Sequence, residues 1–314
     1  MPLPNDPESR EWLELSGANP DLVDQFRPAL VSFIAADKAR FLGSAGTGFF
    51  IGFSEGLALL MTARHVLDFV GSMQRPHSRH AASALKMFLP KTDPLSIKHG
   101  SVAALWANEM HAQALHIEYA SLNDTDVACC LAIPELSSKT SFIPACLQLS
   151  TEPPKVGSLI HYVSYLLQEP EEISPLEELP EDAFKLTRSV SVRRGTVIGV
   201  HWQGYRQYGW PCITTTIPAE PGMSGGFAYL VGEHGTPLGV CGIICADNSS
   251  VEARKNPFLA GESVVAMSVL ALGLQIPIQT TDTSPRRTLQ EMMRAGDFPS
   301  PIGGFEQFKI TLAD

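Results

Sequence analysis

A serine flanked by glycines is the feature that most constrains this 314-residue chain. Residues 220–226 have the sequence EPGMSGG, with Ser224 as the fifth residue. Glycine tolerates positive φ angles and lets another backbone approach closely. Hydrophobic segments, 211–217 and 227–231, flank the motif on both sides. The pattern therefore predicts a tight turn between two strands with a hydroxyl at its tip, although glycine and serine are common in turns of every kind.

Two upstream segments carry residue types that a serine nucleophile needs. His65 follows a hydrophobic run, and Asp126 precedes another one. A serine hydroxyl is a poor nucleophile at neutral pH unless a base lies within hydrogen-bond reach, and that base needs an acceptor that orients it. We therefore expect Ser224 to act as nucleophile, His65 as general base and then acid, and Asp126 as the group that holds the imidazole tautomer.

The motifs resemble those of the trypsin/chymotrypsin-like serine peptidases, most closely the bacterial high-temperature-requirement and related trypsin-like enzymes. The matching segments are Gly46-Thr47-Gly48-Phe49, Thr62-Ala63-Arg64-His65-Val66, Asp126-Val127-Ala128, Pro221-Gly222-Met223-Ser224-Gly225-Gly226 and the strand 239–244. The resemblance covers roughly residues 28–270 and follows the order His, Asp, Ser. It implies an oxyanion hole made of the backbone N–H groups of Gly222 and Ser224, where loss of one donor costs about 3 kcal/mol.

Each of these residues also has a purely structural interpretation. Ser224 could be a plain turn serine, and His65 a histidine at a strand–helix junction. Either Asp124 or Asp126 could be the acceptor of an Asx turn. We prefer Asp126 because it directly precedes Val-Ala, as in the family that the chain resembles. The combined order and context favour a catalytic triad.

The resemblance also indicates where a substrate pocket would lie. Its three parts would be Pro218, the segment Cys245, Ala246 and Asp247, and the final strand near Ser263. Trypsin-like enzymes carry an aspartate at the first part, where this chain has Pro218, so a preference for basic side chains is not implied. Asp247 would restore that preference if it pointed inward. Our hypothesis is a small or medium apolar side chain before the scissile bond.

The fold class predicted is all-β. The 24 prolines and 25 glycines suggest many turns, and short strands at regular spacing argue for a barrel or sandwich. By resemblance we expect two six-stranded antiparallel β-barrels of the chymotrypsin type, with the active site between them. The division would be an N-terminal extension (1–27), a first barrel (28–135), a second barrel (136–272) and a C-terminal extension (273–314).

Single elements were assigned from hydrophobic patterning. We expect a helical patch around residues 8–15, a helical turn over 63–70, a helix over 288–295 and an exposed acidic insertion over 169–182. The predicted strands are 28–35, 46–53, 57–62, 84–89, 101–107, 112–119, 127–133, 156–163, 189–200, 211–217, 227–231, 238–245 and 262–270.

Composition narrows the function. A net charge of −10 argues against a nucleic-acid partner. No apolar run approaches the roughly 20 residues that a membrane helix needs, and the first 20 residues lack the pattern of a signal peptide. Five of the six cysteines lie in apolar stretches, which favours free buried thiols and a cytoplasmic protein. The histidines form no recognisable metal set, and we expect no cofactor.

These observations lead to two functional hypotheses. The first is a serine endopeptidase that works through an acyl-enzyme and carries out limited cleavage of a protein or peptide substrate inside the cell. Its N- and C-terminal extensions could dock a regulatory protein partner. Met223 stands directly before the nucleophile, where the digestive enzymes have an aspartate that pairs with a newly cut N-terminus, so we expect activity without that cleavage. The second is a non-catalytic or dormant binding module with the protease fold, since a fold does not guarantee activity.

Overall fold

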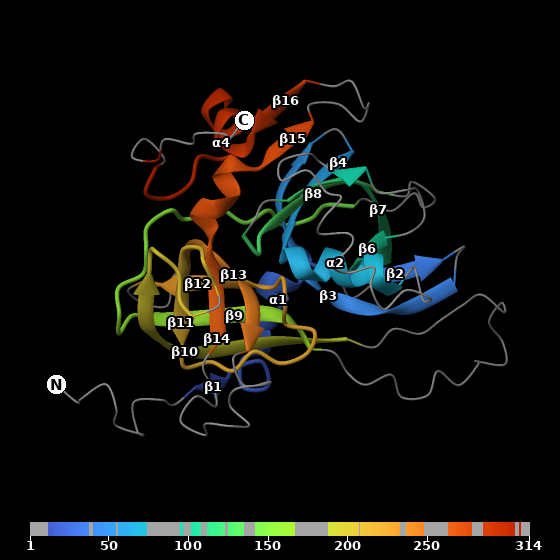
Figure 1. The fold of residues 1–314 in the computed structure, drawn as a ribbon. Helices are drawn as coiled ribbons and strands as arrows, with labels where there is room; N and C mark the ends of the chain where they lie inside the picture. The colour runs from blue at the N-terminus through green and yellow to red at the C-terminus, as the bar shows by residue number, and fades with distance from the viewer. Residues whose placement is uncertain are drawn as a thin grey trace, which may run out of the picture.

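The computed structural model describes residues 12–37, 40–54, 56–73, 95–96, 102–107, 112–122, 125–134, 142–166, 188–206, 208–232, 237–247, 263–277, 285–304 and 308. Figure 1 shows two strand-rich units beside each other, with the C-terminal elements lying above them. The predicted strand 84–89 and the acidic insertion 169–182 lie outside the described residues.

The first unit is a closed barrel. Its strands are β2 (Leu30–Asp37), β3 (Arg40–Ser54), β4 (Leu57–Thr62), β5 (Leu95–Ser96), β6 (Val102–Ala107), β7 (Ala112–Leu122) and β8 (Ala128–Pro134), and α2 (Arg64–Met73) follows β4. Six antiparallel strands pair in the order β7-β6-β2-β3-β4-β8, and β8 pairs again with β7. The short β5 pairs with β7 in addition.

The second unit closes in the same way. Its strands are β9 (Leu159–Leu166), β10 (Ser189–His201), β11 (Cys212–Thr215), β12 (Phe227–Val231), β13 (Pro237–Asp247) and β14 (Ser263–Met267). They pair antiparallel in the order β10-β11-β14-β13-β12-β9, and β9 pairs again with β10. The predicted fold of two six-stranded antiparallel barrels of the chymotrypsin type is therefore confirmed.

Short elements outside the barrels pack against them. The N-terminal ones are β1 (Leu13–Glu14), α1 (Pro20–Phe26) and the 3₁₀ turn η2 (Arg27–Ala29). The C-terminal ones are the 3₁₀ turn η5 (Ser268–Gly273), β15 (Gln275–Pro277), β16 (Arg286–Thr288) and α4 (Leu289–Ala295). Thr288 caps α4 in a reciprocal capping box with Glu291, and Gly296 ends the helix with a φ of 84°.

One continuous apolar core links the two barrels. Phe227 of β12 lies with its ring centroid 5.3 Å from that of Phe49 in β3, and 5.5 Å from that of Phe26 at the end of α1. All three side chains are buried. The C-terminal region packs on both units: Phe298 lies against β3 at Gly52, and Ile302 exchanges backbone hydrogen bonds with residues 149 and 151.

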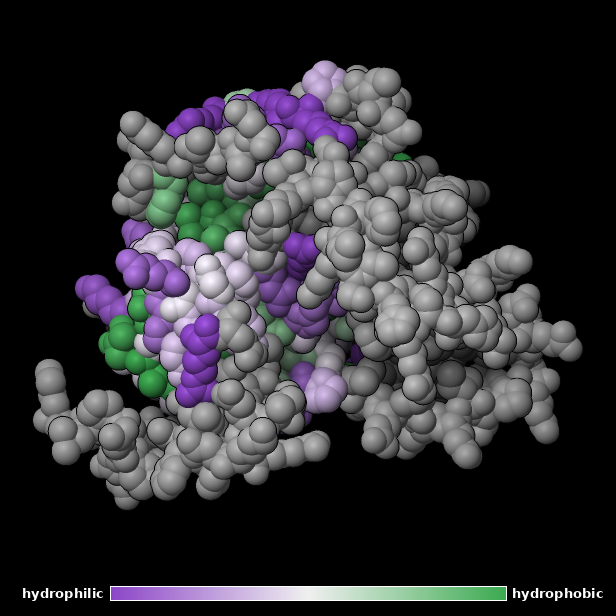
Figure 2. Space-filling model, viewed as in Figure 1, coloured by the Kyte–Doolittle hydropathy of each residue, from purple (hydrophilic) through white to green (hydrophobic). Residues whose placement is uncertain are grey.

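Figure 2 shows hydrophilic and apolar surface in separate patches. Hydrophilic surface covers the C-terminal elements at the top and also lies in the middle of the view, between the barrels. Apolar surface lies on the left, over the second barrel. Within the described residues, no helix has the length and apolar character needed to span a membrane.

Three sequence-based element predictions were wrong in detail. Leu13 and Glu14 form strand β1 along β10 instead of a helix, because the Glu14 carboxylate hydrogen-bonds to residues of β10. The strand predicted over 262–270 ends at Met267, where the chain turns into η5. The strand predicted over 156–163 begins only at Leu159 and runs to Leu166. All six cysteines are free, and five are buried, with Cys146 exposed.

A buried histidine in the second barrel makes stability depend on pH. His161 of β9 lies opposite Tyr229 of β12, and its Nδ1 is 2.7 Å from the tyrosine hydroxyl. Burial, followed by the positive charge of Arg194, lowers the pKa of His161 from 6.5 to about 4. The imidazole is therefore neutral in the folded protein over a range where the unfolded chain takes up a proton.

We predict that the free energy of unfolding falls as the pH drops from 6.5 towards 4, by at most about 3 kcal/mol from this group. His161→Gln keeps a polar side chain but removes the titration, so the variant should lose much of this pH dependence. Urea unfolding of both proteins at about pH 7 and pH 5 measures the difference. An equally steep loss in the variant would contradict this role of His161.

Candidate active site

His65 and Asp126 form the best-defined polar pair of the site. His65 is the second residue of α2, and Asp126 precedes β8, whose strand pairs with β4. The Asp126 carboxylate accepts from the backbone N–H of His65 at 3.0 Å and lies 2.7 Å from His65 Nδ1. It thereby satisfies an N–H group at the start of the helix, where negative charge is favourable.

This pairing determines which imidazole nitrogen is available. An ionised carboxylate can only accept hydrogen bonds, so His65 Nδ1 carries the proton. In the neutral ring, Nε2 then has the free lone pair that a general base needs. The His65 side chain is 43% exposed and that of Asp126 is 18% exposed, so the base faces solvent while its acceptor is enclosed. Asp124, the alternative acceptor, lies outside the described residues.

Ser224 lies on the turn that connects β11 to β12. Gly222 and Gly225, on either side of it, have φ angles of 92° and 84°, which explains why glycine is needed there. A Cβ atom on Gly225 would lie 2.0 Å from the carbonyl oxygen of Thr47. The turn is therefore pressed directly onto the first barrel.

The Ser224 hydroxyl donates to the backbone carbonyl of Cys245 at 3.3 Å. No hydrogen bond joins Ser224 to His65, both of which the structure describes. The two residues nonetheless belong to adjoining segments: a Cβ on Gly46 would contact both the carbonyl of Ser224 and the side chain of Val66, the neighbour of His65. Hydrogen bonds between catalytic groups are often loose before substrate binds, so this geometry does not argue against a triad.

Cys245 forms hydrogen bonds with both Ser224 and Asp126. Besides accepting from Ser224, it donates its thiol to the backbone carbonyl of Asp126 at 3.6 Å. Burial, followed by the nearby Asp126 charge, raises the pKa of the Cys245 thiol well above its ordinary value. The group therefore stays protonated and acts as a donor, not as a competing nucleophile.

The backbone N–H groups of Gly222 and Ser224 are the predicted oxyanion-hole donors. Within the turn, Met223 N–H donates to Glu220 O at 3.0 Å and Gly226 N–H to Met223 O at 2.9 Å. In the described part of the chain, the N–H groups of Gly222 and Ser224 have no acceptor. They are therefore available to an oxygen atom of a ligand.

Thr47 connects both barrels to the turn that carries Ser224. We call this turn, residues 218–226, the nucleophile turn after the role expected for Ser224. Its N–H donates to Ser224 O and its hydroxyl to Gly222 O, each at 2.8 Å, while the same hydroxyl accepts from Tyr165 N–H at 3.0 Å. Thr47 has no exposed surface. It belongs to the Gly-Thr-Gly motif, which was the only signal in the sequence for this role.

The predicted pocket residues are not all gathered at one point. Pro218 directs its carbonyl to Arg193, and Ser263 is buried with its hydroxyl 2.6 Å from that of Tyr162. Ala246 and Asp247 continue β13 beyond Cys245 and pair with Val264 and Ser263. Among the described hydrogen bonds of these residues, that of Cys245 O joins it to the Ser224 hydroxyl. The sequence analysis missed Tyr162, Arg193 and Glu14, whose partners lie far away along the chain.

Comparisons with known proteins add only a distant likeness. No family model and no curated protein matches the chain. Two solved structures of Rv3671c from M. tuberculosis H37Rv are similar: a serine-to-alanine mutant in an inactive form (18% identity over 81% of this chain and 87% of that one, TM-score 0.43) and the protease in an inactive form (18% identity, 81% and 90%, TM-score 0.42). The assignment of the fold therefore rests on the strand pairing.

We predict that Thr47→Val destabilises the protein by about 2–4 kcal/mol, because the carbonyl of Gly222 and the N–H of Tyr165 would be left without partners. Thr47→Ser is the matched control: it keeps the hydroxyl, removes one methyl group, and should cost about 1 kcal/mol. Urea unfolding of the three proteins gives the values. A loss in Thr47→Ser as large as that in Thr47→Val would show that the hydroxyl contributes no more than the methyl group, and would contradict this role of the hydroxyl.

Proposed function

We propose that the protein is a serine endopeptidase whose nucleophile is Ser224. The observation that carries the proposal is that the Asp126 carboxylate binds His65 twice, at its backbone N–H and at Nδ1. A pair of this kind leaves Nε2 as the base, beside a turn that presents a serine hydroxyl and two free N–H groups. Such a combination of base, orienting acceptor, nucleophile and anion-binding donors is what acyl transfer requires.

In the proposed reaction, the Ser224 hydroxyl first leaves Cys245 O by rotation about its Cα–Cβ bond and turns to His65 Nε2. As Oγ attacks the scissile carbonyl carbon, Nε2 takes its proton, and the oxygen that becomes negative is bound by the N–H groups of Gly222 and Ser224. Asp126 stabilises the imidazolium. The protonated His65 then donates to the leaving amine, which gives an acyl-enzyme, and a water molecule activated by Nε2 releases the acid product.

We also propose a branch of the family, a cellular location and a substrate preference. The motifs that the chain shares with the bacterial high-temperature-requirement and related trypsin-like enzymes support a place near that branch. Six free cysteines support a reducing, cytoplasmic environment and an intracellular protein substrate. Pro218 is uncharged where trypsin-like enzymes carry an aspartate, which supports a preference for an apolar side chain before the scissile bond. A peptide-library cleavage profile dominated by arginine or lysine would exclude this preference.

One observation favours the second candidate, a dormant or non-catalytic binding module. The Ser224 hydroxyl is engaged by Cys245 O and not by His65. If the hydroxyl kept this position when a peptide bound, the site would hold the peptide without cleaving it. The two candidates differ in the reactivity of Ser224.

Labelling with a fluorophosphonate probe tests this difference. We predict that the wild type is labelled, that Ser224→Ala is not, and that Asp126→Asn is labelled about 10³–10⁴-fold more slowly because the imidazole loses its orienting acceptor. A folded wild type that reacts no faster than Ser224→Ala would favour the binding module.

A further inference from the structure

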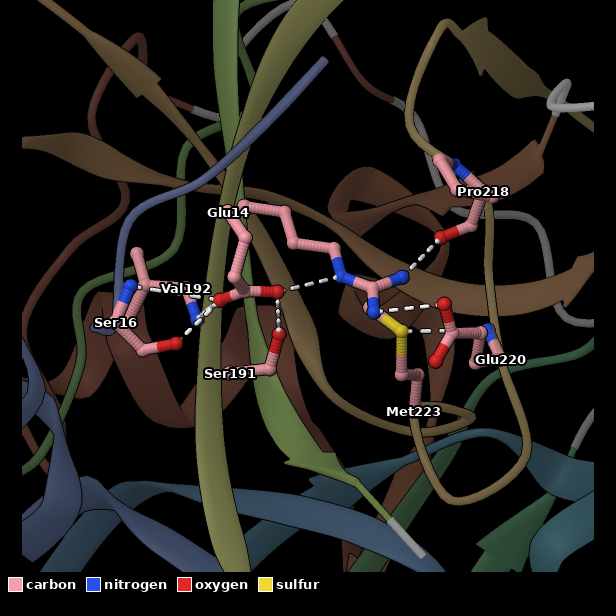
Figure 3. A network of polar contacts seen from close by, with 8 residues as sticks. Glu14, Ser16, Ser191, Val192, Pro218, Glu220 and Met223 are labelled. Carbon is pink, nitrogen blue, oxygen red and sulfur yellow. Dashed lines mark hydrogen bonds and ion pairs between the residues drawn. The ribbon is translucent and has the colours of Figure 1, made fainter. Parts of the chain in front are cut away.

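Arg193 is a buried cation on β10 whose contacts join two distant segments. Its side chain is only 4% exposed. Nε donates to Glu14 Oε2 at 2.9 Å, one terminal nitrogen donates to Pro218 O at 3.0 Å, and the other lies 2.8 Å from Glu220 Oε1. Figure 3 shows Glu14 on one side of the guanidinium, with Pro218 and Glu220 on the other. The side chain therefore bridges the N-terminal segment and the turn that carries Ser224.

On the N-terminal side, Glu14 is fixed by several donors. Its carboxylate accepts from Ser191 Oγ at 2.9 Å, from the backbone N–H of Val192 at 3.2 Å, and from Ser16. Burial opposes ionisation, but the hydrogen bonds from Ser16, Arg193 and Ser191 outweigh it and lower the pKa of Glu14. The carboxylate is therefore charged at neutral pH.

Trp12 completes the enclosure of Arg193. The guanidinium carbon lies 4.7 Å from the centre of the Trp12 ring, a geometry that favours a cation–π contact. Backbone pairing of β1 with β10 places Glu14 opposite Arg193. Residues 12–16, which we call the N-terminal strap, thus cover Arg193 and supply one of its two counter-charges.

On the other side, Arg193 holds the start of the nucleophile turn. Pro218 and Glu220 are both bound by it, and Glu220 O accepts from Met223 N–H. The backbone N–H of Glu220 also lies 3.3 Å from the Met223 sulfur (Figure 3). Met223 is buried and uncharged, so within residues 218–223 the ionic anchor of the turn is Glu220.

We propose that the N-terminal strap positions the nucleophile turn: Glu14 fixes Arg193, and Arg193 fixes residues 218–223 so that the N–H groups of Gly222 and Ser224 point to the site of reaction. This inference rests on the proposed function. Glu14 and Arg193 are positioning residues, because neither contacts the reacting atoms. Removing one counter-charge of a buried guanidinium leaves that cation poorly compensated, so loss of the Glu14 charge should let the guanidinium, and with it the turn, shift.

The experiment uses the full chain, three single variants and one double variant. Glu14→Gln removes the charge with little change in shape, and its kcat for a peptide substrate and its rate of fluorophosphonate labelling should fall about 10-fold with little change in KM, because the loss lies in transition-state binding. Asp24→Asn is the matched control: it removes a carboxylate paired with Arg27 on nearby α1 and should leave both rates unchanged. If Glu14 acts through Arg193, Glu14→Gln should have no further effect in an Arg193→Met background.

Hydrogen exchange of residues 218–226 gives a readout that does not depend on catalysis. Glu14→Gln should speed exchange of the Met223 and Gly226 N–H groups, whose hydrogen bonds close the turn. Thermal unfolding, measured alongside, shows whether each variant is folded. A purely structural role would lower the melting temperature without lowering the labelling rate of the folded protein.

The outcomes separate the two proposals. Slower labelling together with faster exchange supports the positioning role. A folded Glu14→Gln that labels and exchanges like the wild type overturns it. If the wild type reacts no faster than Ser224→Ala, the proposed function fails, and exchange alone decides: faster exchange in Glu14→Gln supports coupling of the strap to the turn, and unchanged exchange overturns it.

Discussion

The hydrogen bonds of Thr47 are the constraint on which the relation between the two barrels depends. One fully buried residue of β3 binds the carbonyls of Gly222 and Ser224 and accepts from Tyr165 at the end of β9. A third link, from Thr62 Oγ1 to Thr47 O at 2.7 Å, ties the same residue to β4, the strand that leads to His65. Thr47 therefore holds both the nucleophile turn and the strand that leads to the histidine from one position in the interior.

Around this point, the polar groups of Asp126 and Cys245 are enclosed but paired. Asp126 satisfies the start of α2 and orients His65, while its backbone carbonyl accepts from the Cys245 thiol. A buried donor or acceptor without a partner costs about 1–3 kcal/mol, so such pairing is what permits a polar site between two apolar barrels. By contrast, the N–H groups of Gly222 and Ser224 have no acceptor among the described residues. Unpaired donors of this kind are typical of groups that a ligand completes.

The sequence predicted what depends on local patterning. Hydrophobic patterning located β4, β10, β12 and the helix α4, because the period of apolar residues is encoded over a few residues. The motif context also identified His65 and Asp126 as a pair, which the 2.7 Å contact now describes in space. The catalytic roles of these residues stay predictions.

What the sequence did not predict depends on contacts between distant segments. Glu14 and Arg193 are 179 residues apart, and Thr47 and Gly222 are 175 apart, so no local signal marks either pair. Residues 8–11 of the helix expected around 8–15 lie outside the described residues, but its part at Leu13 and Glu14 was wrong for the same reason: the pairing of β1 with β10 and the contacts of Glu14 override the local helical preference. The proposed positioning role of the N-terminal strap depends on these long-range contacts alone.

The central claim is that Ser224, His65 and the N–H groups of the turn act on one reacting centre. A crystal structure with a peptidyl boronic acid would test it most directly. The account predicts a bond from boron to Ser224 Oγ, one boronate oxygen within hydrogen-bond distance of Gly222 N and Ser224 N, and His65 Nε2 facing the adduct. A boronic acid bound without a bond to Ser224, with the hydroxyl still on Cys245 O, would contradict the account.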